Sequence, residues 1–158
     1  MDEEILEEED TQKDKYLSFT LDGENYGVDI ALVREIIGFL PIAKVPDVPD
    51  FIQGIINLRG KIIPVLDMRL RLNKEFRAYT DRTCIIVIEI FGVEVGLIVD
   101  MVSEVLTIAE DLISPQPDLK SLKHEYVKGI GRLKDAVILL LDVEELLKTD
   151  DLAGLSTE

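Results

Sequence analysis

The sequence repeats itself, and this repeat constrains the fold more than any other feature. Residues 15–37 align without a gap with residues 84–106, at an offset of 69, and keep glycines, a glutamate and alternating apolar positions in register. The alignment resumes between residues 54–72 and 129–147 at an offset of 75, so the second copy has a longer middle loop. The chain therefore reads as two copies of one small unit, about 15–73 and about 84–148.

Each copy begins with a pattern typical of a β-hairpin. Residues 16–21 alternate between apolar and polar, and Asp22-Gly23 follows, a pair that tolerates the positive φ of a tight turn. Phe91-Gly92 takes the same place in the second copy. The pattern predicts a mainly β fold of two small five-stranded β-barrels, SH3-like or OB-like, with few short helices. They should share a hydrophobic interface, because a unit this small has a marginal core of its own.

Other local patterns complete the unit. The amphipathic segments 30–37 and 99–106 are too short to be stable helices alone, so they should pack on a sheet and flank the interface. Pro64 lacks a backbone donor and predicts a sheet edge or a bulge. Asp67 and Asp142 each precede a short helical pattern, so each is more readily a helix cap than a catalytic acid.

The charge is distributed unevenly. The net charge of −15 argues against nucleic acid as a partner, because phosphates demand a basic surface. Residues 1–14 contribute −7 and predict a disordered, solubilising tail, with an acidic docking arm as the alternative. Residues 149–158 form a second acidic tail. The first copy has no net charge and the second has −6, so the two copies differ in surface chemistry.

Enzymatic chemistry is poorly supported. The chain has one histidine, His124, and one cysteine, Cys84, and it contains no nucleophile elbow, phosphate-binding glycine loop or zinc-ligand spacing. We therefore expect no catalytic residue, no metal and no cofactor. A small-ligand-binding or enzymatic β-barrel that uses the groove between the barrels remains the alternative. We see no signal peptide and no membrane-spanning stretch, and expect a cytoplasmic protein without direct membrane insertion.

Two segments are candidates for binding another protein. In the run from Gly54 to Gly60, Arg59 lies between apolar residues and a glycine turn, where it either projects into a groove or is merely a solvated hairpin tip. The apolar side of residues 30–36 is either pure core or partly exposed to receive a helix. The sequence leaves both pairs of alternatives open.

These segments resemble the CheW family of chemotaxis coupling proteins. The similarity is carried by residues 26–30, 33–36, 51–60 and 62–69, continues through 95–100 and 129–131, and so covers nearly all of residues 15–148. The run Asn-Leu-Arg-Gly at 57–60 is its most specific part.

The resemblance implies a stand-alone, non-catalytic adaptor. Such proteins bind the regulatory domain of the CheA histidine kinase and the helical-hairpin tips of membrane chemoreceptors, and they are recruited to membrane-associated receptor arrays. The implied fold is two five-stranded barrels that partly exchange strands, so the boundary at residues 74–83 need not separate the spatial units.

The resemblance also implies a receptor-binding groove. Its expected residues are Ile30, Val33, Glu35, Ile36, Gly54, Asn57, Arg59, Gly60, Val99 and Val105. An apolar groove that receives an amphipathic helix is a common mode of recognition, and Glu35 or Arg59 would orient the helix. The kinase surface is expected mainly on the second repeat, about 84–148, with no residue assigned.

Overall fold

The computed structural model describes residues 13–115 and 126–147. The acidic segment 1–12, His124 and the tail 149–158 lie outside the described residues. The strands are β1 (Lys15–Leu21), β2 (Glu24–Asp29), β3 (Val33–Gly38), β4 (Ile52–Leu58), β5 (Lys61–Asp67), β6 (Cys84–Ile90), β7 (Val93–Val99), β8 (Met101–Thr107), β9 (Ile113–Pro115), β10 (Val127–Arg132) and β11 (Val137–Leu141). The helical elements are η1 (Ile30–Leu32), α2 (Met68–Arg71), η2 (Glu110–Leu112) and α3 (Val143–Leu146).

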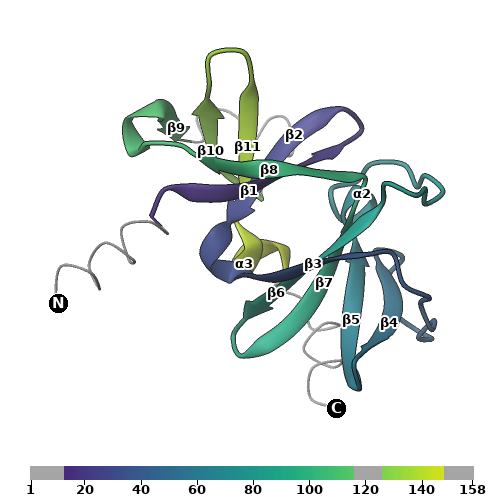
Figure 1. The fold of residues 1–158 in the computed structure, drawn as a ribbon. Helices are drawn as coiled ribbons and strands as arrows, with labels where there is room; N and C mark the ends of the chain where they lie inside the picture. The colour runs from purple at the N-terminus through teal and green to yellow at the C-terminus, as the bar shows by residue number, and fades with distance from the viewer. Residues whose placement is uncertain (1–12, 116–125, 148–158) are drawn as a thin grey trace, which may run out of the picture.

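The strands form two sheets, drawn in the upper and lower halves of Figure 1. Sheet A has the order β8-β1-β2-β11-β10-β9, and sheet B has the order β3-β6-β7-β5-β4. The mainly β fold of two small units is thereby confirmed, with six strands in one sheet and five in the other.

Each sheet contains strands of both repeats. The β1–β2 hairpin of the first repeat lies between β8 and β11 of the second, and the β6–β7 hairpin of the second lies between β3 and β5 of the first. The parallel contacts correspond as well, since Gly27 pairs with Leu140 and Gly96 with Val65. The repeats therefore exchange their first hairpins reciprocally, as the resemblance implied.

The expected barrels do not close through strand pairing. Within the described residues, β8 and β9 are the edges of sheet A, and β3 and β4 are the edges of sheet B. Ala43 forms an antiparallel bridge to Ile55 on the outer side of β4, at the place where β9 extends sheet A beside β10. These short additions cover one edge of each sheet without joining it to the other edge.

The largest hydrophobic core lies between the sheets. The residues that alternate inward on the two exchanged first strands all belong to it: Leu17, Phe19, Leu21, Ile86, Ile88 and Ile90. Two smaller clusters lie inside the individual units, one around Ile56 and Val87 in sheet B and one around Ile108 and Leu140 in sheet A. The predicted shared interface is thus the main core of the molecule.

One pair of equivalent glycines has a packing reason. A Cβ on Gly96 would lie 2.8 Å from side-chain atoms of both Ile85 and Val65, and a Cβ on Gly27 would lie 3.1 Å from Leu140. These are the places where a hairpin of one repeat packs against a parallel strand of the other. Glycine permits the close approach, and this explains why the alignment keeps it.

The structure differs from the predictions for the two amphipathic segments and for Pro64. Residues 33–38 and 101–107 are edge strands of the sheets rather than segments lying on them. Pro64 lies in β5, an interior strand, so the predicted edge is wrong. Ile55, the cross-strand partner of Pro64, directs its backbone N–H and C=O to Ala43 instead of to Pro64. On the other side of β5, the ladder to β7 begins only at Val65. No ladder hydrogen bond therefore needs the N–H that proline lacks.

The two aspartates are helix caps, as predicted. The Asp67 carboxylate accepts a hydrogen bond from the Leu70 backbone N–H, and the Asp142 carboxylate accepts one from Glu145, each at 3.2 Å. Each side chain thereby satisfies one of the unpaired donors at the start of a four-residue helix.

Candidate protein-binding site

The apolar face between the sheets continues onto two exposed edge positions. Ile36 of β3 pairs with Ile86, a residue of the shared core, and its side chain is 44% exposed. Val105 of β8 pairs with Leu17, another core residue, and is 50% exposed. The two positions are equivalent in the repeats, so each sheet presents one uncovered apolar residue beside the interface.

Other expected groove residues are less accessible. Ile30 and Val33 are half-buried against the shared core. Val99 is 1% exposed and belongs to that core, so its side chain offers no surface to a partner. Its apolar, β-branched character in the sequence fits a core residue and a groove residue equally well, and register decides between them.

Gly54 is also buried, and its role is structural. Its φ is +147°, and a Cβ there would lie 2.1 Å from the Ala43 carbonyl oxygen. Glycine allows the bridge between Ala43 and Ile55 to form on the outer side of β4. The sequence placed Gly54 in the groove, whereas the structure assigns it the close contact that fixes the start of this hairpin.

The β4–β5 turn holds Arg59 at the surface. Arg59 and Gly60 have φ values of 52° and 88°, and the Asn57 side-chain oxygen accepts a hydrogen bond of 2.8 Å from the Gly60 N–H. This turn, with positive φ at both central residues, matches the twist of the strands that it joins. It projects the Arg59 side chain into solvent with 68% of its surface exposed.

Arg59 forms an ion pair with Glu35, on the opposite edge strand of sheet B. The hydrogen bond to Glu35 raises the pKa of Arg59. β3 and β4 are the two edges of this sheet, and Arg59 lies in the turn that follows β4. The sheet therefore curls far enough for side chains to span between them, and no backbone ladder joins these edges in the described residues. The ion pair also brings the two predicted segments, 30–36 and 54–60, to one place.

In the part of sheet A that the structure describes, no equivalent ion pair is present. Glu104 and Lys134 are the equivalents of Glu35 and Arg59, and no salt bridge joins them in the described part of the chain. Val105 therefore stands on the second unit without the charged pair that accompanies Ile36. Ile30, Val33 and Ile36 thus lie on the side of sheet B that faces the shared core, and Glu35 meets Arg59 in the ion pair. Asn57 and Gly60 lie at the same turn as Arg59, and Val105 lies on sheet A.

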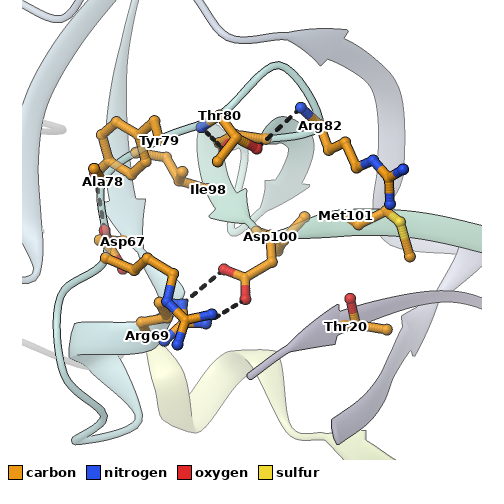
Figure 2. A pocket seen from close by; sticks show the side chains of 13 residues that line it. Thr20, Asp67, Arg69, Ala78, Tyr79, Thr80, Arg82, Ile98, Asp100 and Met101 are labelled. Carbon is orange, nitrogen blue, oxygen red and sulfur yellow. Dashed lines mark hydrogen bonds and ion pairs between the residues drawn. The ribbon is translucent and has the colours of Figure 1, made fainter. Parts of the chain in front are cut away.

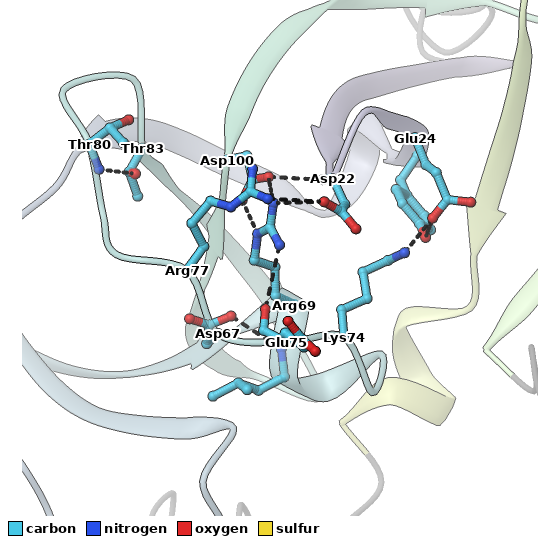
Figure 3. A network of polar contacts seen from close by, with 12 residues as sticks. Asp22, Glu24, Asp67, Arg69, Lys74, Glu75, Arg77, Thr80, Thr83 and Asp100 are labelled. Atoms are coloured by element: carbon cyan, nitrogen blue, oxygen red, sulfur yellow. Dashed lines mark hydrogen bonds and ion pairs between the residues drawn. The ribbon is translucent and has the colours of Figure 1, made fainter.

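A second polar site joins the two sheets, and the sequence analysis missed it (Figure 3). Arg69 of α2 binds Asp100 through two hydrogen bonds of 2.8 and 2.6 Å, and its side chain is only 5% exposed. Asp100 also accepts a hydrogen bond of 2.9 Å from the backbone N–H of Asp22, in the turn of sheet A. We call these three residues the clamp.

The clamp fixes the charge on Asp100. Burial raises the pKa of this carboxyl, but the hydrogen bonds from Arg69 and from the Asp22 backbone outweigh burial and hold the pKa below its ordinary value. Asp100 lies where the chain passes from β7 of sheet B to β8 of sheet A. An arginine and two aspartates far apart in sequence carry no local motif, so only the topology could reveal them.

A cavity of about 270 Å³ lies beside the clamp (Figure 2). On its wall the Tyr79 hydroxyl donates a hydrogen bond of 2.8 Å to Asp67, and burial together with this carboxylate raises the pKa of Tyr79. Both carboxylates of the cavity, Asp67 and Asp100, are thus already engaged in helix capping, hydrogen bonds or an ion pair. Neither carboxylate among the described lining residues is therefore free of a hydrogen-bond partner.

The described residues contain neither a group of metal ligands nor a membrane-spanning helix. Within 13–115 and 126–147, no group of three or more His, Cys, Asp or Glu side chains could hold a metal ion. None of the helices in these ranges is long and apolar enough to cross a membrane.

Comparisons with known proteins agree with one another. The model of the CheW-like domain matches residues 15–151. The chemotaxis protein CheW of Klebsiella aerogenes is 37% identical over 145 residues, which cover 91% of this chain and 87% of that protein. CheW of Bacillus subtilis is 38% identical over 135 residues, which cover 85% and 86% of the two chains. The crystal structure of the scaffolding protein TtCheW from Thermoanaerobacter tengcongensis has a TM-score of 0.81 and 40% identity, and the match covers 87% of this chain and 94% of that one.

A pair of strand-exchanged sheets around one shared core, with exposed apolar residues at its edges, defines a class of small β-rich domains. The chain belongs to the CheW-like family. It is therefore a scaffolding protein of chemotaxis rather than an enzyme, and the alternative of an enzymatic barrel is not supported.

Proposed function

We propose that this chain couples chemoreceptors to a CheA-type histidine kinase by binding both. One observation carries the receptor half of the proposal. Ile36 is exposed on the face of β3 that carries the shared core, and its neighbour in the chain, Glu35, forms the ion pair with Arg59. An apolar contact next to an oriented charge pair suits an amphipathic helix, which presents an apolar stripe with charges at its border.

The proposed receptor surface is smaller than the sequence suggested. Its contacts are the side chains of Ile30, Val33, Glu35, Ile36, Asn57 and Arg59 and the backbone of Gly60, with Val105 contributing from sheet A. Val99 and Gly54 act indirectly, since one packs in the core beneath this surface and the other shapes the hairpin.

The kinase is proposed to bind mainly the second repeat, about 84–148. The support is the acidic balance of that repeat, −6 against no net charge in the first, which gives two related units unlike surfaces. Binding through different units lets one chain hold both partners at once. Recruitment to membrane-associated receptor arrays follows from receptor binding and needs no membrane anchor in the chain.

The test is a bridging experiment. The full chain is mixed with a purified kinase regulatory domain and a soluble receptor cytoplasmic fragment, singly and together, and the complexes are separated by size-exclusion chromatography. We expect a complex with each partner and a larger one that contains all three. A folded chain that binds neither partner, or whose partners displace each other, would contradict the proposal.

A further inference from the structure

The chain crosses between the sheets at two equivalent places, and only one of them is filled. At the first, Arg69 reaches across to Asp100, and residues 74–83 follow α2 and cover the site. At the second crossing, the repeat places Ala31 where Asp100 stands and Glu144 where Arg69 stands. The ion pair of the clamp therefore cannot form there.

The second crossing is an open groove of about 400 Å³. Its apolar lining includes Leu32, Ile90 and Val143, and its carboxylates are Asp29, Asp142 and Glu144. Sheet A, sheet B and α3 all contribute to it. It adjoins the proposed receptor surface at Ile30, which lies between Asp29 and Ala31, but contains neither Arg59 nor Glu35.

The charges of this groove are unbalanced. Among the described residues that line it, Lys128 is the one lysine or arginine, and it forms an ion pair of 2.8 Å with Asp29. Asp142 uses one oxygen to cap α3, and no donor among the described residues reaches its second oxygen. At the filled crossing, the second oxygen of the equivalent Asp67 accepts the Tyr79 hydroxyl.

Phe91 occupies the turn next to a residue that lines the groove, and its backbone conformation is unfavourable. It follows Ile90, has a φ of 55° and is 71% exposed. Its counterpart Asp22 has the same φ, which aspartate, asparagine and glycine tolerate better than a bulky side chain. A positive φ is costly for a phenylalanine, and Phe91 belongs to none of the hydrophobic clusters of the described residues, which is typical of a residue that serves binding.

We propose that the groove docks an extended segment of a partner protein that carries a tyrosine and a cationic side chain. The tyrosine hydroxyl donates to the open oxygen of Asp142, an arginine or lysine pairs with Glu144, and Phe91 covers the apolar part of the segment. The partner thus supplies in trans the chemistry that residues 74–83 supply at the first crossing. Most of the groove belongs to the second repeat, to which the kinase contact is assigned above, but the proposal does not rest on that assignment.

The probe is a synthetic peptide with the sequence of residues 74–83, which contains Arg77, Tyr79 and Arg82. It is titrated into the full ¹⁵N-labelled chain, and amide shifts are followed by NMR. We expect saturable shifts confined to residues 29–32, 90–92 and 142–145. A control peptide with R77Q, Y79F and R82Q should bind at least about fivefold more weakly, because it lacks both arginines and the tyrosine hydroxyl.

Two variants of the chain locate the contact. Glu144→Lys should weaken peptide binding by about threefold or more, whereas Asp135→Lys, the same charge change at an exposed hairpin tip, should not. Phe91→Asn should weaken binding by about tenfold. The same change should leave the unfolding midpoint equal or higher, because asparagine tolerates the positive φ. This combination separates a binding residue from a structural one.

Four results would overturn the proposal. One is the absence of peptide-induced shifts at the groove, and another is binding that Glu144→Lys and Phe91→Asn leave unchanged. The third is binding seen only after residues 148–158 are removed, which would assign the groove to the chain's own C-terminal segment. The fourth is self-association of the wild-type chain that Phe91→Asn abolishes, which would assign it to a second copy.

Discussion

The two crossings between the sheets share a backbone path but differ in the side chains around it. At one, Arg69 is buried between Asp100 and Asp22 and ties α2 to both sheets. At the other, Ala31 and Glu144 leave a groove. The comparison teaches that the repeats have kept their apolar positions, which build one shared core, while their polar positions have diverged. One crossing stabilises the pair of sheets and the other is free to take part in binding.

The largest expected effect is the loss of Arg69. Arg69→Ala leaves the partly buried Asp100 without its cation, so we expect the free energy of unfolding to fall by about 2–3 kcal/mol. The equivalent change at the other crossing, Glu144→Ala, removes an exposed side chain and should alter it by no more than about 0.5 kcal/mol. Urea unfolding of both variants measures the difference. Equal losses would mean that the two crossings do not differ in the way described.

A smaller effect concerns pH. Because the folded state holds the pKa of Asp100 below its ordinary value of 3.8, the ionised carboxylate contributes stability above that value. This contribution is lost as the pH falls through the lower pKa of the folded state. Asp100→Asn should therefore be less stable than the wild type at pH 7, and the gap should narrow as the pH falls below about 4.

Urea unfolding at a series of pH values follows that gap directly. Other carboxylates titrate in both proteins, so the difference between the two curves isolates Asp100. A gap that stays constant from pH 7 to pH 2 would show that the charge of Asp100 does not contribute through the clamp.

Much of the fold could be predicted from the sequence because it depends on local and repeated patterns. The alternation in residues 16–21, the turns at Asp22-Gly23 and Phe91-Gly92, and the caps Asp67 and Asp142 are decided within a few residues of chain. The closure of the barrels could not be decided in this way. It depends on whether edges far apart in sequence meet, and in sheet B they meet through side chains.

In the candidate site, too, local segments were predictable and contacts between distant segments were not. Arg59 and Glu35 were recognised from their segments, but their ion pair requires the curl of sheet B. In the sequence, Val99 is equally suited to a groove and to a core. In the structure the strand register places it in the core, where it is buried. Arg69 and Asp100 could not be predicted as a site because they are 31 positions apart and form no sequence motif. Only the folded chain brings them into contact.

The most direct measurement of the central claim is the affinity of the full chain for a receptor cytoplasmic fragment, by calorimetry, in the wild type and in Arg59→Glu. We expect the substitution to weaken binding by about tenfold or more and to leave the free energy of unfolding nearly unchanged, since Arg59 is exposed. Lys134→Glu, the same charge reversal at the equivalent hairpin of the second repeat, should change the affinity by no more than about twofold. Equal effects of the two reversals, or a loss of stability that accounts for the loss of binding, would contradict a receptor site on the curled edge of sheet B.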